Sequence, residues 1–233
     1  MSEAVDHDLA LASALSDAWQ KDGFPLTQGQ VSDLVGYLSL LNRWNRVHSL
    51  TAIQSGPQQV QRHLLDALVV WPELVRRFGS DPAIRIADIG SGMGVPGIVW
   101  SIVMPQSHFV LVERQQKKVA FLRHVIGRLG LSKRVSVASQ DVRDVTAEHP
   151  FDLITSRAFA ALPEFIRLTQ HLSGPGTQWG AMVGKAPPEQ EVSEHLLLKM
   201  NNKVGGLSLE EVVPLKVPGL SEPRHLVWIR RSS

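Results

Sequence analysis

The sequence predicts an α/β protein: a mostly parallel sheet with helices on both faces, preceded by a helical N-terminal cap. Short apolar runs of β type alternate with helical segments from residue 84 onward, an alternation typical of parallel sheets. Residues 9–75 have helical periodicity and no strand pattern. The first β-type run also stops at a glycine cluster that opens a helix, a common turn in ligand-binding α/β folds.

The N-terminal section predicts a cap of packed helices. Its apolar residues keep the spacing of one buried helical stripe at Leu34, Leu38 and Leu41. Residues 55–57, Ser-Gly-Pro, break the pattern, a second run resumes at residue 58, and Pro72 ends or kinks that run. We therefore divide the chain into a helical cap, residues 1–80, and a main domain, residues 81–233.

Seven β-type runs follow the cap, and helical patterns separate them. The β-type runs are residues 84–89, 108–113, 134–138, 151–155, 179–183, 209–217 and 225–230. The helical patterns are residues 98–103, 117–129, 163–172 and 189–200, with Gly130 as the expected C-cap of the second. The last two β-type runs are expected to close the sheet as a pair.

Composition excludes several classes of protein. The 233 residues contain no cysteine, which excludes disulfides and thiolate metal sites and fits a reducing cytoplasm. No apolar run approaches the ~20 residues needed to cross a bilayer. The first residues carry Glu3, Asp6 and Asp8 instead of the basic start of a secretory signal. His63 has no second metal ligand at a suitable spacing, so we expect no metal site.

Basic residues are clustered although the net charge is only +2. The groups are Arg43, Arg46 and His48; Arg62 and His63; Arg123, His124, Arg128, Lys133 and Arg134; and Arg230 and Arg231. Each group fits either a solvated face or a surface that binds nucleic-acid phosphates.

The strongest local signal is the glycine-rich segment 88–97, Asp-Ile-Gly-Ser-Gly-Met-Gly-Val-Pro-Gly. Glycine permits both the backbone angles of a tight turn and a close approach of backbone to a ligand. Pro96 suits the first turn of the helix that follows. The segment therefore predicts a ligand-binding loop.

Two ligands fit this loop. Gly92, Gly94 and Gly97 match the dinucleotide pattern G-x-G-x-x-G, and Glu113 follows about 20 residues on, where a ribose-binding acid is expected. In the other hypothesis Gly90, Gly92 and Gly94 form the loop of a methyltransferase, and Glu113 accepts hydrogen bonds from the ribose hydroxyls of S-adenosylmethionine. The loop alone leaves a dehydrogenase and a methyltransferase open.

An ordered set of motifs surrounds the loop. It comprises Leu41–Asn45 with Leu50–Thr51, Arg62–Asp66, Asp88–Gly92 with Val95–Ile98, Lys117–Lys118 with Phe121–Leu122, Ser156–Ala158, and Lys185. In this order the motifs resemble the glucose-inhibited division protein B family, whose members are 16S ribosomal RNA guanine-N7 methyltransferases. The resemblance runs from about residue 38 to residue 185.

The resemblance implies a Rossmann-like class I methyltransferase with a seven-stranded, mostly parallel sheet. It implies that S-adenosylmethionine is the cofactor and that 16S ribosomal RNA or the small ribosomal subunit is the partner. The expected cofactor-binding residues are Asp88, Gly90, Gly92, Gly94, Val95, Glu113, Val142, Arg143 and Arg157. Arg157 and Lys185 are expected to border the catalytic cleft.

The chain departs from the family pattern at four positions. Arg143 stands where an acid is usual, so backbone contact with the cofactor is expected there. Ser49, Ala67 and Ala186 replace a usual asparagine, serine and glycine.

Three functions therefore remain in competition at this stage. They are an S-adenosylmethionine-dependent RNA methyltransferase, an NAD-dependent dehydrogenase, and a non-enzymatic RNA-binding or ribosome assembly protein. We expect the first, as a cytoplasmic monomer.

Overall fold

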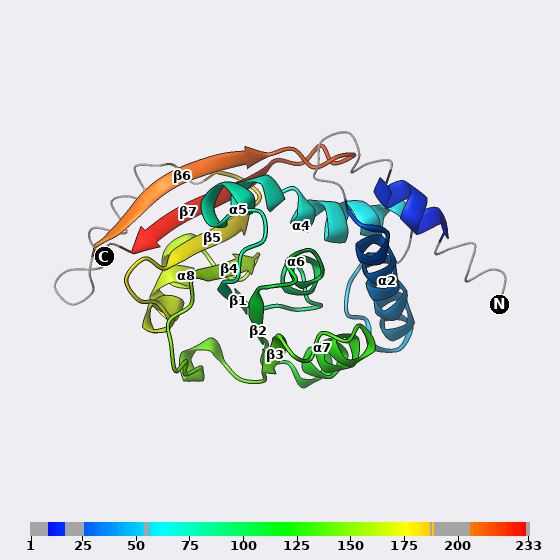
Figure 1. Cartoon of the computed structure of the whole chain (residues 1–233), viewed down its shortest axis with the longest axis horizontal. Helices are drawn as coiled ribbons and strands as arrows, with labels where there is room; N and C mark the ends of the chain where they lie inside the picture. Colours follow the sequence, from blue (N-terminus) through cyan, green and yellow to red (C-terminus); the bar gives the residue numbers. More distant parts are fainter. Residues whose placement is uncertain (1–8, 17–25, 54–55, 187, 189–205, 232–233) are drawn as a thin grey trace.

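Seven strands form one sheet in the order β3-β2-β1-β4-β5-β7-β6 within the described residues of a computed structural model, 9–16, 26–53, 56–186, 188 and 206–231 (Figure 1). The strands are β1 (Arg85–Ile89), β2 (His108–Val112), β3 (Val135–Ala138), β4 (Leu153–Arg157), β5 (Gln178–Val183), β6 (Leu207–Leu215) and β7 (Arg224–Arg231). The first five pair in parallel, and β7 pairs antiparallel with both β5 and β6. The predicted mostly parallel, seven-stranded sheet and its closing strand pair are confirmed.

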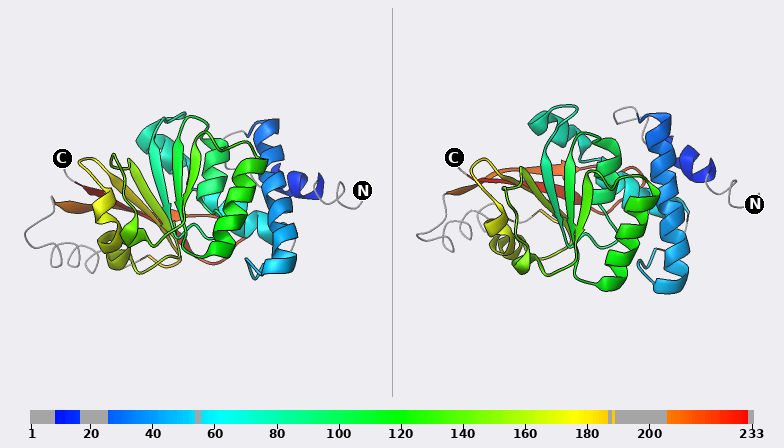
Figure 2. Two further views of the ribbon diagram at one scale, coloured as in Figure 1. Left: turned by 90° about the horizontal axis from the view of Figure 1, so that it is seen from below. Right: turned by 60° about the horizontal axis from the view of Figure 1, so that its bottom comes forward.

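Helices cover both faces of the sheet (Figure 2). One face carries α6 (Gly97–Val103), α7 (Gln116–Arg128) and the N-terminal helices, and the other carries α8 (Leu162–Thr169). Successive residues of β1 alternate between the two cores, since Ile86 belongs to the first hydrophobic cluster and Ala87 to the second. A parallel sheet buried on both faces needs such apolar residues on each side.

The cap is built from four helices after residue 27. They are α2 (Gln28–His48), α3 (Pro57–Gln59), α4 (Asp66–Leu68) and α5 (Trp71–Phe78), with a π-helical segment η1 (Val60–Leu65) between α3 and α4. Residues 9–16 are also helical. Thr27 and Gln30 cap the start of α2 by exchanging hydrogen bonds between side chain and backbone, which satisfies two free amides of the first turn.

Pro72 has a different place from the one expected. The second helical run ends at Leu68, and Pro72 lies in the first turn of α5. Proline is tolerated in a first turn because the amide that it lacks has no partner inside the helix. The periodicity also did not predict the π-helical segment or the short 3₁₀ helices η2 (Val142–Asp144) and η3 (Gln170–Leu172).

The other helices lie close to their predicted positions. The C-cap of α7 is Leu129, one residue before the expected Gly130, and Gly130 has the left-handed φ of +67° that commonly follows a C-cap. The predicted helix 163–172 is α8 continued by η3. The predicted helix 189–200 lies outside the described residues. None of the helices in the described ranges has the length and apolar character required to span a membrane.

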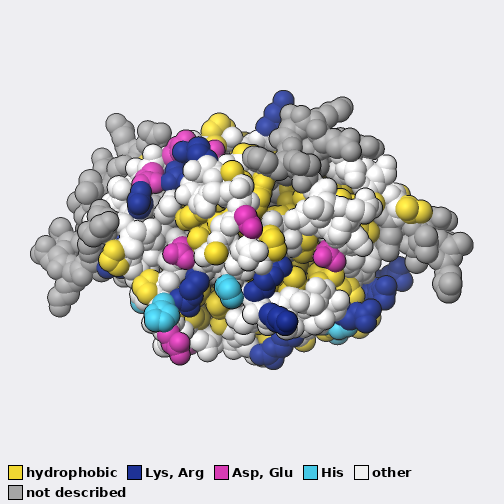
Figure 3. All heavy atoms as spheres, in the orientation of Figure 1, with side chains coloured by type: hydrophobic (Ala, Val, Ile, Leu, Met, Phe, Trp, Pro, Cys, Tyr) yellow, Lys and Arg dark blue, Asp and Glu magenta, His cyan; other side chains and the backbone are white. Residues whose placement is uncertain are grey.

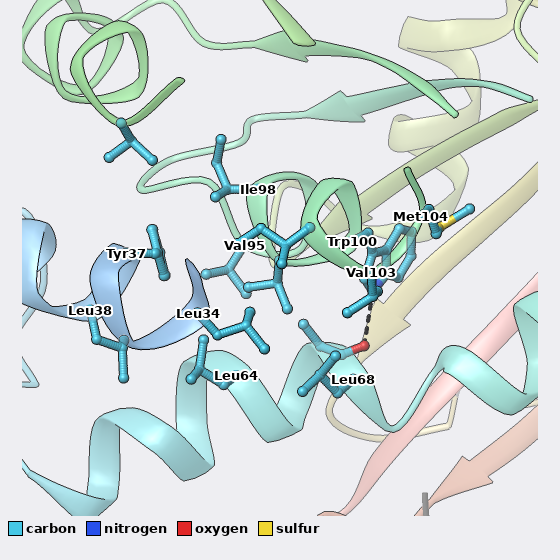
Figure 4. Packing of buried hydrophobic residues seen from close by; sticks show 14 of the residues in the cluster. Leu34, Tyr37, Leu38, Leu64, Leu68, Val95, Ile98, Trp100, Val103 and Met104 are labelled. Carbon is cyan, nitrogen blue, oxygen red and sulfur yellow. Dashed lines mark hydrogen bonds between the residues drawn. The ribbon is translucent and has the colours of Figure 1, made fainter. Parts of the chain in front are cut away.

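The cap shares one hydrophobic core with the sheet. Leu34 from α2, Leu64 from η1 and Val95 from the glycine-rich loop belong to the same buried cluster (Figure 4). The indole Nε1–H of Trp100 in α6 donates to the carbonyl of Ala67 at 2.9 Å. This hydrogen bond ties the helix after the glycine-rich loop to the cap.

Replacing Trp100 tests this link. Trp100 is 1% exposed. Trp100→Phe should lower the free energy of unfolding by roughly 1–3 kcal/mol, because the carbonyl of Ala67 stays buried without its donor. Trp100→Ala should lower it by about 3–5 kcal/mol through the cavity that it leaves. Urea unfolding measures both, with Val47→Ala as control because Val47 is 76% exposed. A free energy of unfolding for Trp100→Phe equal to that of the unmodified protein would contradict the role of the hydrogen bond.

Candidate functional site

The loop after β1 is held in a shape that only glycine adopts without strain. Gly90, Gly92 and Gly94 have φ of +68°, +60° and +96°. A Cβ on Gly94 would lie 2.4 Å from Cγ1 of Ile98, and one on Gly90 would lie 2.5 Å from the ring of Phe159. Gly90 and Gly94 are therefore required both by backbone angle and by space, and Gly92 by backbone angle.

Glu113, directly after β2, anchors the loop from the neighbouring strand. Its Oε2 accepts from the amide of Gly92 at 3.0 Å, and its Oε1 accepts from the amide of Gln115 at 2.8 Å. Each carboxylate oxygen can still accept a further hydrogen bond. The carboxylate thus fixes the loop and remains able to bind ligand hydroxyls.

A pocket of about 560 Å³ opens at the carboxyl ends of the first four strands. Its lining includes Gly90 after β1, Glu113 after β2, Val142 after β3 and Phe159 after β4. Open α/β sheets bind their ligands at this edge, and the volume is within the ~300–1,000 Å³ of small-molecule sites. This pocket is the candidate active site.

Four of the predicted site residues line the pocket. They are Gly90, Glu113, Val142 and Arg143. The side chain of Arg143 is engaged by Asp141, because its Nε and Nη2 donate to the two carboxylate oxygens at 2.8 and 3.0 Å. This guanidinium holds the pKa of the Asp141 carboxyl well below its usual range. Cofactor contact through the backbone, as expected for position 143, is compatible with this geometry.

The other predicted residues are placed around the pocket but do not line it. Gly92 and Gly94 form the inner part of the loop, and Val95 is buried in the core shared with the cap. Lys185 is exposed just beyond β5.

Asp88 lies beneath the loop and is 1% exposed. Its Oδ2 accepts from the amide of Gly97 at 3.0 Å, whereas Oδ1 has no hydrogen-bond partner among the described residues. Burial raises the pKa of the Asp88 carboxyl to about 7. An acceptor left free in a dry site beside the loop is suited to a donor on a bound ligand.

Arg157, the last residue of β4, turns its side chain toward the cap. Its Nη1 donates to the carbonyl of Arg62 at 2.7 Å and to Oδ2 of Asp66 at 3.0 Å. The other oxygen of Asp66 accepts from Nε of Arg224 at 2.9 Å. One carboxylate from the cap therefore joins the ends of β4 and β7, and cofactor contact by Arg157 stays a prediction.

Several pocket residues, Phe159 and Asp141 among them, were not predicted from the sequence. The ring of Phe159 lies against Gly90 and makes an edge contact with Phe165, with 6.4 Å between ring centroids. Asp141 caps η2 by accepting from the amide of Arg143 at 3.1 Å. An aromatic residue just after a β-type run was the available signal for Phe159, whereas a three-residue 3₁₀ helix leaves no periodic pattern.

Comparison with known proteins identifies the family. The family model described as rRNA small subunit methyltransferase G matches residues 30–226. A relative with that name in Leptothrix cholodnii is 38% identical, over 98% of this chain and 97% of its own. Another in Chromobacterium violaceum is 42% identical, over 87% and 89%. The chain belongs to the rRNA small subunit methyltransferase G family.

Solved structures show the same fold. A SAM-dependent methyltransferase from Aquifex aeolicus has a TM-score of 0.51 at 18% identity, covering 76% of this chain and 94% of that one. P. horikoshii TYW2, solved in complex with MeSAdo, has a TM-score of 0.56 at 16% identity, covering 78% and 66%. The predicted Rossmann-like class I methyltransferase fold is confirmed.

Membership in the rRNA small subunit methyltransferase G family also decides between the two hypotheses for the glycine-rich loop. The loop is that of a methyltransferase, and the NAD-dependent dehydrogenase is not favoured. Gly97, which the dinucleotide pattern needed, opens α6, and a Cβ there would lie 2.3 Å from Cδ2 of Leu111. Its role is the close packing of helix on strand.

The site residues fit S-adenosylmethionine, the cofactor of this class of enzyme. Gly90 exposes backbone where a side chain would fill the space, and Glu113 offers carboxylate lone pairs to hydroxyl donors. Asp88, buried beneath the loop, fixes the start of α6 through the amide of Gly97. A ligand with a ribose and positive charge matches this set of acceptors.

Removing the carboxylate of Asp66 should destabilise the fold. Asp66→Ala leaves Arg157 and Arg224, whose side chains are 22% and 23% exposed, without their shared partner. We expect a loss of roughly 2–4 kcal/mol in urea unfolding, toward the lower part of the range for buried pairs because both guanidinium groups keep some water. The control is Glu222→Ala, which breaks the exposed pair with Arg62 and should leave the free energy of unfolding nearly unchanged, because water screens that pair. If both variants lose similar amounts of free energy of unfolding, Asp66 stabilises the fold no more than an exposed ion pair does.

The pKa of Asp88 predicts a pH dependence of stability. The carboxyl titrates near 7 in the fold and near 3.8 in the unfolded chain, so the unfolded chain binds fewer protons between these values. The free energy of unfolding should therefore fall, through this group, as pH rises from 4 to 7. In Asp88→Asn, which has no carboxyl at this position, the free energy of unfolding should not show this decrease. Urea unfolding, repeated from about pH 4.5 to about pH 7.5 in steps of roughly half a unit, measures this pH dependence. If the free energies of unfolding of the two proteins change with pH in parallel, the prediction is wrong.

Proposed function

We propose that this protein transfers the methyl group of S-adenosylmethionine to N7 of a guanine in 16S ribosomal RNA. The observation that carries the proposal is the family match over residues 30–226 together with a pocket beside the glycine-rich loop at the carboxyl ends of the strands. The partner is 16S ribosomal RNA or the small ribosomal subunit. We infer a cytoplasmic enzyme that acts as a monomer and uses no metal. The division into a cap, residues 1–80, and a catalytic domain, residues 81–233, stays part of this proposal.

The cofactor is held by the loop and by the ends of the neighbouring strands. The backbone of Gly90, Gly92, Gly94 and Val95 cradles it, and Glu113 accepts hydrogen bonds from the ribose hydroxyls. The backbone of Val142 and Arg143 borders the adenine, which suits Arg143 because its side chain is held by Asp141. Asp88 offers its free oxygen to the amino-acid end.

The chemistry needs alignment more than proton transfer. When bound, S-adenosylmethionine supplies a methyl group activated by its sulfonium. Guanine N7 carries a free lone pair at neutral pH, so no side chain has to remove a proton from it. The protein's task is to hold the two partners in line at attack distance. Arg157 and Lys185 border the cleft and position cofactor or RNA phosphate.

Label transfer tests the proposal. The protein is incubated with methyl-labelled S-adenosylmethionine and either 30S particles or protein-free 16S RNA, and the RNA is digested to nucleosides. We expect label in 7-methylguanosine from at least one of the two substrates. Label in another nucleoside, or RNA binding without any transfer, would overturn the assignment, and the second outcome would support an assembly protein.

Glu113→Gln tests the place of the cofactor. The amide keeps the shape of the side chain but replaces a charged acceptor by a neutral one, so affinity for S-adenosylhomocysteine should fall roughly 10-fold to 100-fold, as for the loss of charge-assisted hydrogen bonds. Calorimetry measures it. Glu148→Gln, at an exposed acid outside the pocket lining, is the control and should bind like the unmodified protein. Unchanged affinity in both variants would remove Glu113 from the site.

A further inference from the structure

The positive charge of the protein is concentrated on two neighbouring helices. Together α2 and α7 carry six cations, Arg43, Arg46, Lys117, Lys118, Arg123 and Arg128. They carry one carboxylate, Asp33, near the start of α2. The two helices therefore hold a net charge of +5, although the whole chain has only +2. We call the exposed part of these helices the α2–α7 face.

The cations of this face differ from most described arginines elsewhere, which pair with carboxylates. On α5 and the closing strands, Arg76, Arg77 and Arg230 pair with glutamates. Near the pocket, Arg114 and Arg143 pair with Asp141. Within the described ranges, none of the six cations on α2 and α7 forms an ion pair. Repulsion among unpaired like charges opposes folding, and an anionic partner would offset it.

The two helices are joined into one rigid surface. The ring of Trp44 in α2 contacts the rings of Phe121 and His124 in α7, with 5.7 and 5.6 Å between centroids. Nζ of Lys117 donates to the carbonyl of His48 at the end of α2. Figure 2 shows the two helices side by side in both views, and Figure 3 shows Lys and Arg side chains gathered over α7 and the lower end of α2. Arg43, Arg46 and Arg123 are thereby held on one exposed surface.

The face leads directly to the pocket. Helix α7 begins three residues after Glu113, and Lys118 in its first turn belongs to the pocket lining. A helix of 13 residues is about 20 Å long at ~1.5 Å per residue. A polyanion on the face would therefore extend from the mouth of the pocket along the length of α7.

We propose that the α2–α7 face binds the phosphates of the substrate RNA beside the target nucleotide. The proposal rests on the proposed function for the identity of the polyanion. RNA fits this surface because it carries a phosphate at every nucleotide. The cations without ion pairs likewise follow one another from Lys118 to the end of α2. Phosphate contacts of this kind position the RNA and carry no sequence information.

The test removes three of the six cations of the α2–α7 face without touching the pocket. The triple variant Arg43→Gln, Arg46→Gln, Arg123→Gln changes exposed residues outside the pocket lining. The matched control is Arg76→Gln, Lys216→Gln, Arg230→Gln, which removes the same charge from α5 and the closing strands. Calorimetry with S-adenosylhomocysteine should give both triples the affinity of the unmodified protein, which shows that the pocket is intact. A cooperative thermal melting curve for each triple shows that it is folded.

RNA binding then separates the outcomes. The affinity for protein-free 16S RNA is measured by filter binding over a series of salt concentrations. In the face variant we expect at least about a 10-fold loss at ~0.1 M salt, and a slope of log K against log salt reduced by roughly 2–3 for three lost phosphate contacts. The control triple should keep the slope of the unmodified protein. In the methylation assay KM for RNA should rise while kcat at saturation is kept.

Three results would overturn the proposal. One is unchanged RNA affinity in the face variant, and another is lost affinity with an unchanged salt slope, because then the lost contacts are not with phosphates. The third is impaired methylation of 30S particles with normal binding of protein-free RNA, which would identify an acidic ribosomal protein as the partner of the face. If the unmodified protein transfers no methyl group at all, the proposed function fails, and the salt slopes still decide whether the face binds RNA.

Discussion

The close approach of α6 to the sheet is the constraint on which the site depends. A Cβ at Gly97 would lie 2.3 Å from Leu111, and one at Gly94 would lie 2.4 Å from Ile98, so glycine at both positions lets the helix begin directly above β1. The chain must then pass from strand to helix within a few residues. That short passage turns the backbone of Gly90 toward the pocket and places the amide of Gly92 on Glu113.

The cap belongs to the same physical unit as this turn. Tyr37 in α2 donates from its hydroxyl to the carbonyl of Met93 at 3.1 Å, and the indole of Trp100 donates to Ala67 in the cap. Both hydrogen bonds are made inside a core that contains residues of cap, loop and sheet. The loop is therefore held from two sides, by Glu113 on the sheet and by Tyr37 on the cap. A loop held in this way is preorganised for its ligand, which lowers the entropy lost on binding.

The local sequence pattern predicted the sheet and the loop well, because both depend on residues that are close together in the sequence. The alternation of apolar runs located all seven strands, and the glycines located the turn. The orientation of Arg157 could not be predicted, because it is set by Asp66, which lies 91 positions earlier in the chain. The π-helical turn that carries His63 escaped for a related reason. The apolar spacing of this segment fits an ordinary helix equally well.

The inside of the pocket and the surface next to its mouth present different charged groups, and each suits a different ligand. Inside, Glu113 and the loop backbone are the groups that face a ligand, because Asp141 pairs with Arg114 and Arg143, and Glu164 pairs with Arg167. Outside, along α7 and α2, the cations have no carboxylate partners within the described residues. A cationic cofactor and a polyanionic substrate are each attracted to the surface of opposite sign. Lys118, in the first turn of α7, stands where these two surfaces meet. An RNA held along α7 would bring its target base to the same edge of the sheet at which the cofactor is held, and the contact between cap and sheet is what brings these two surfaces together.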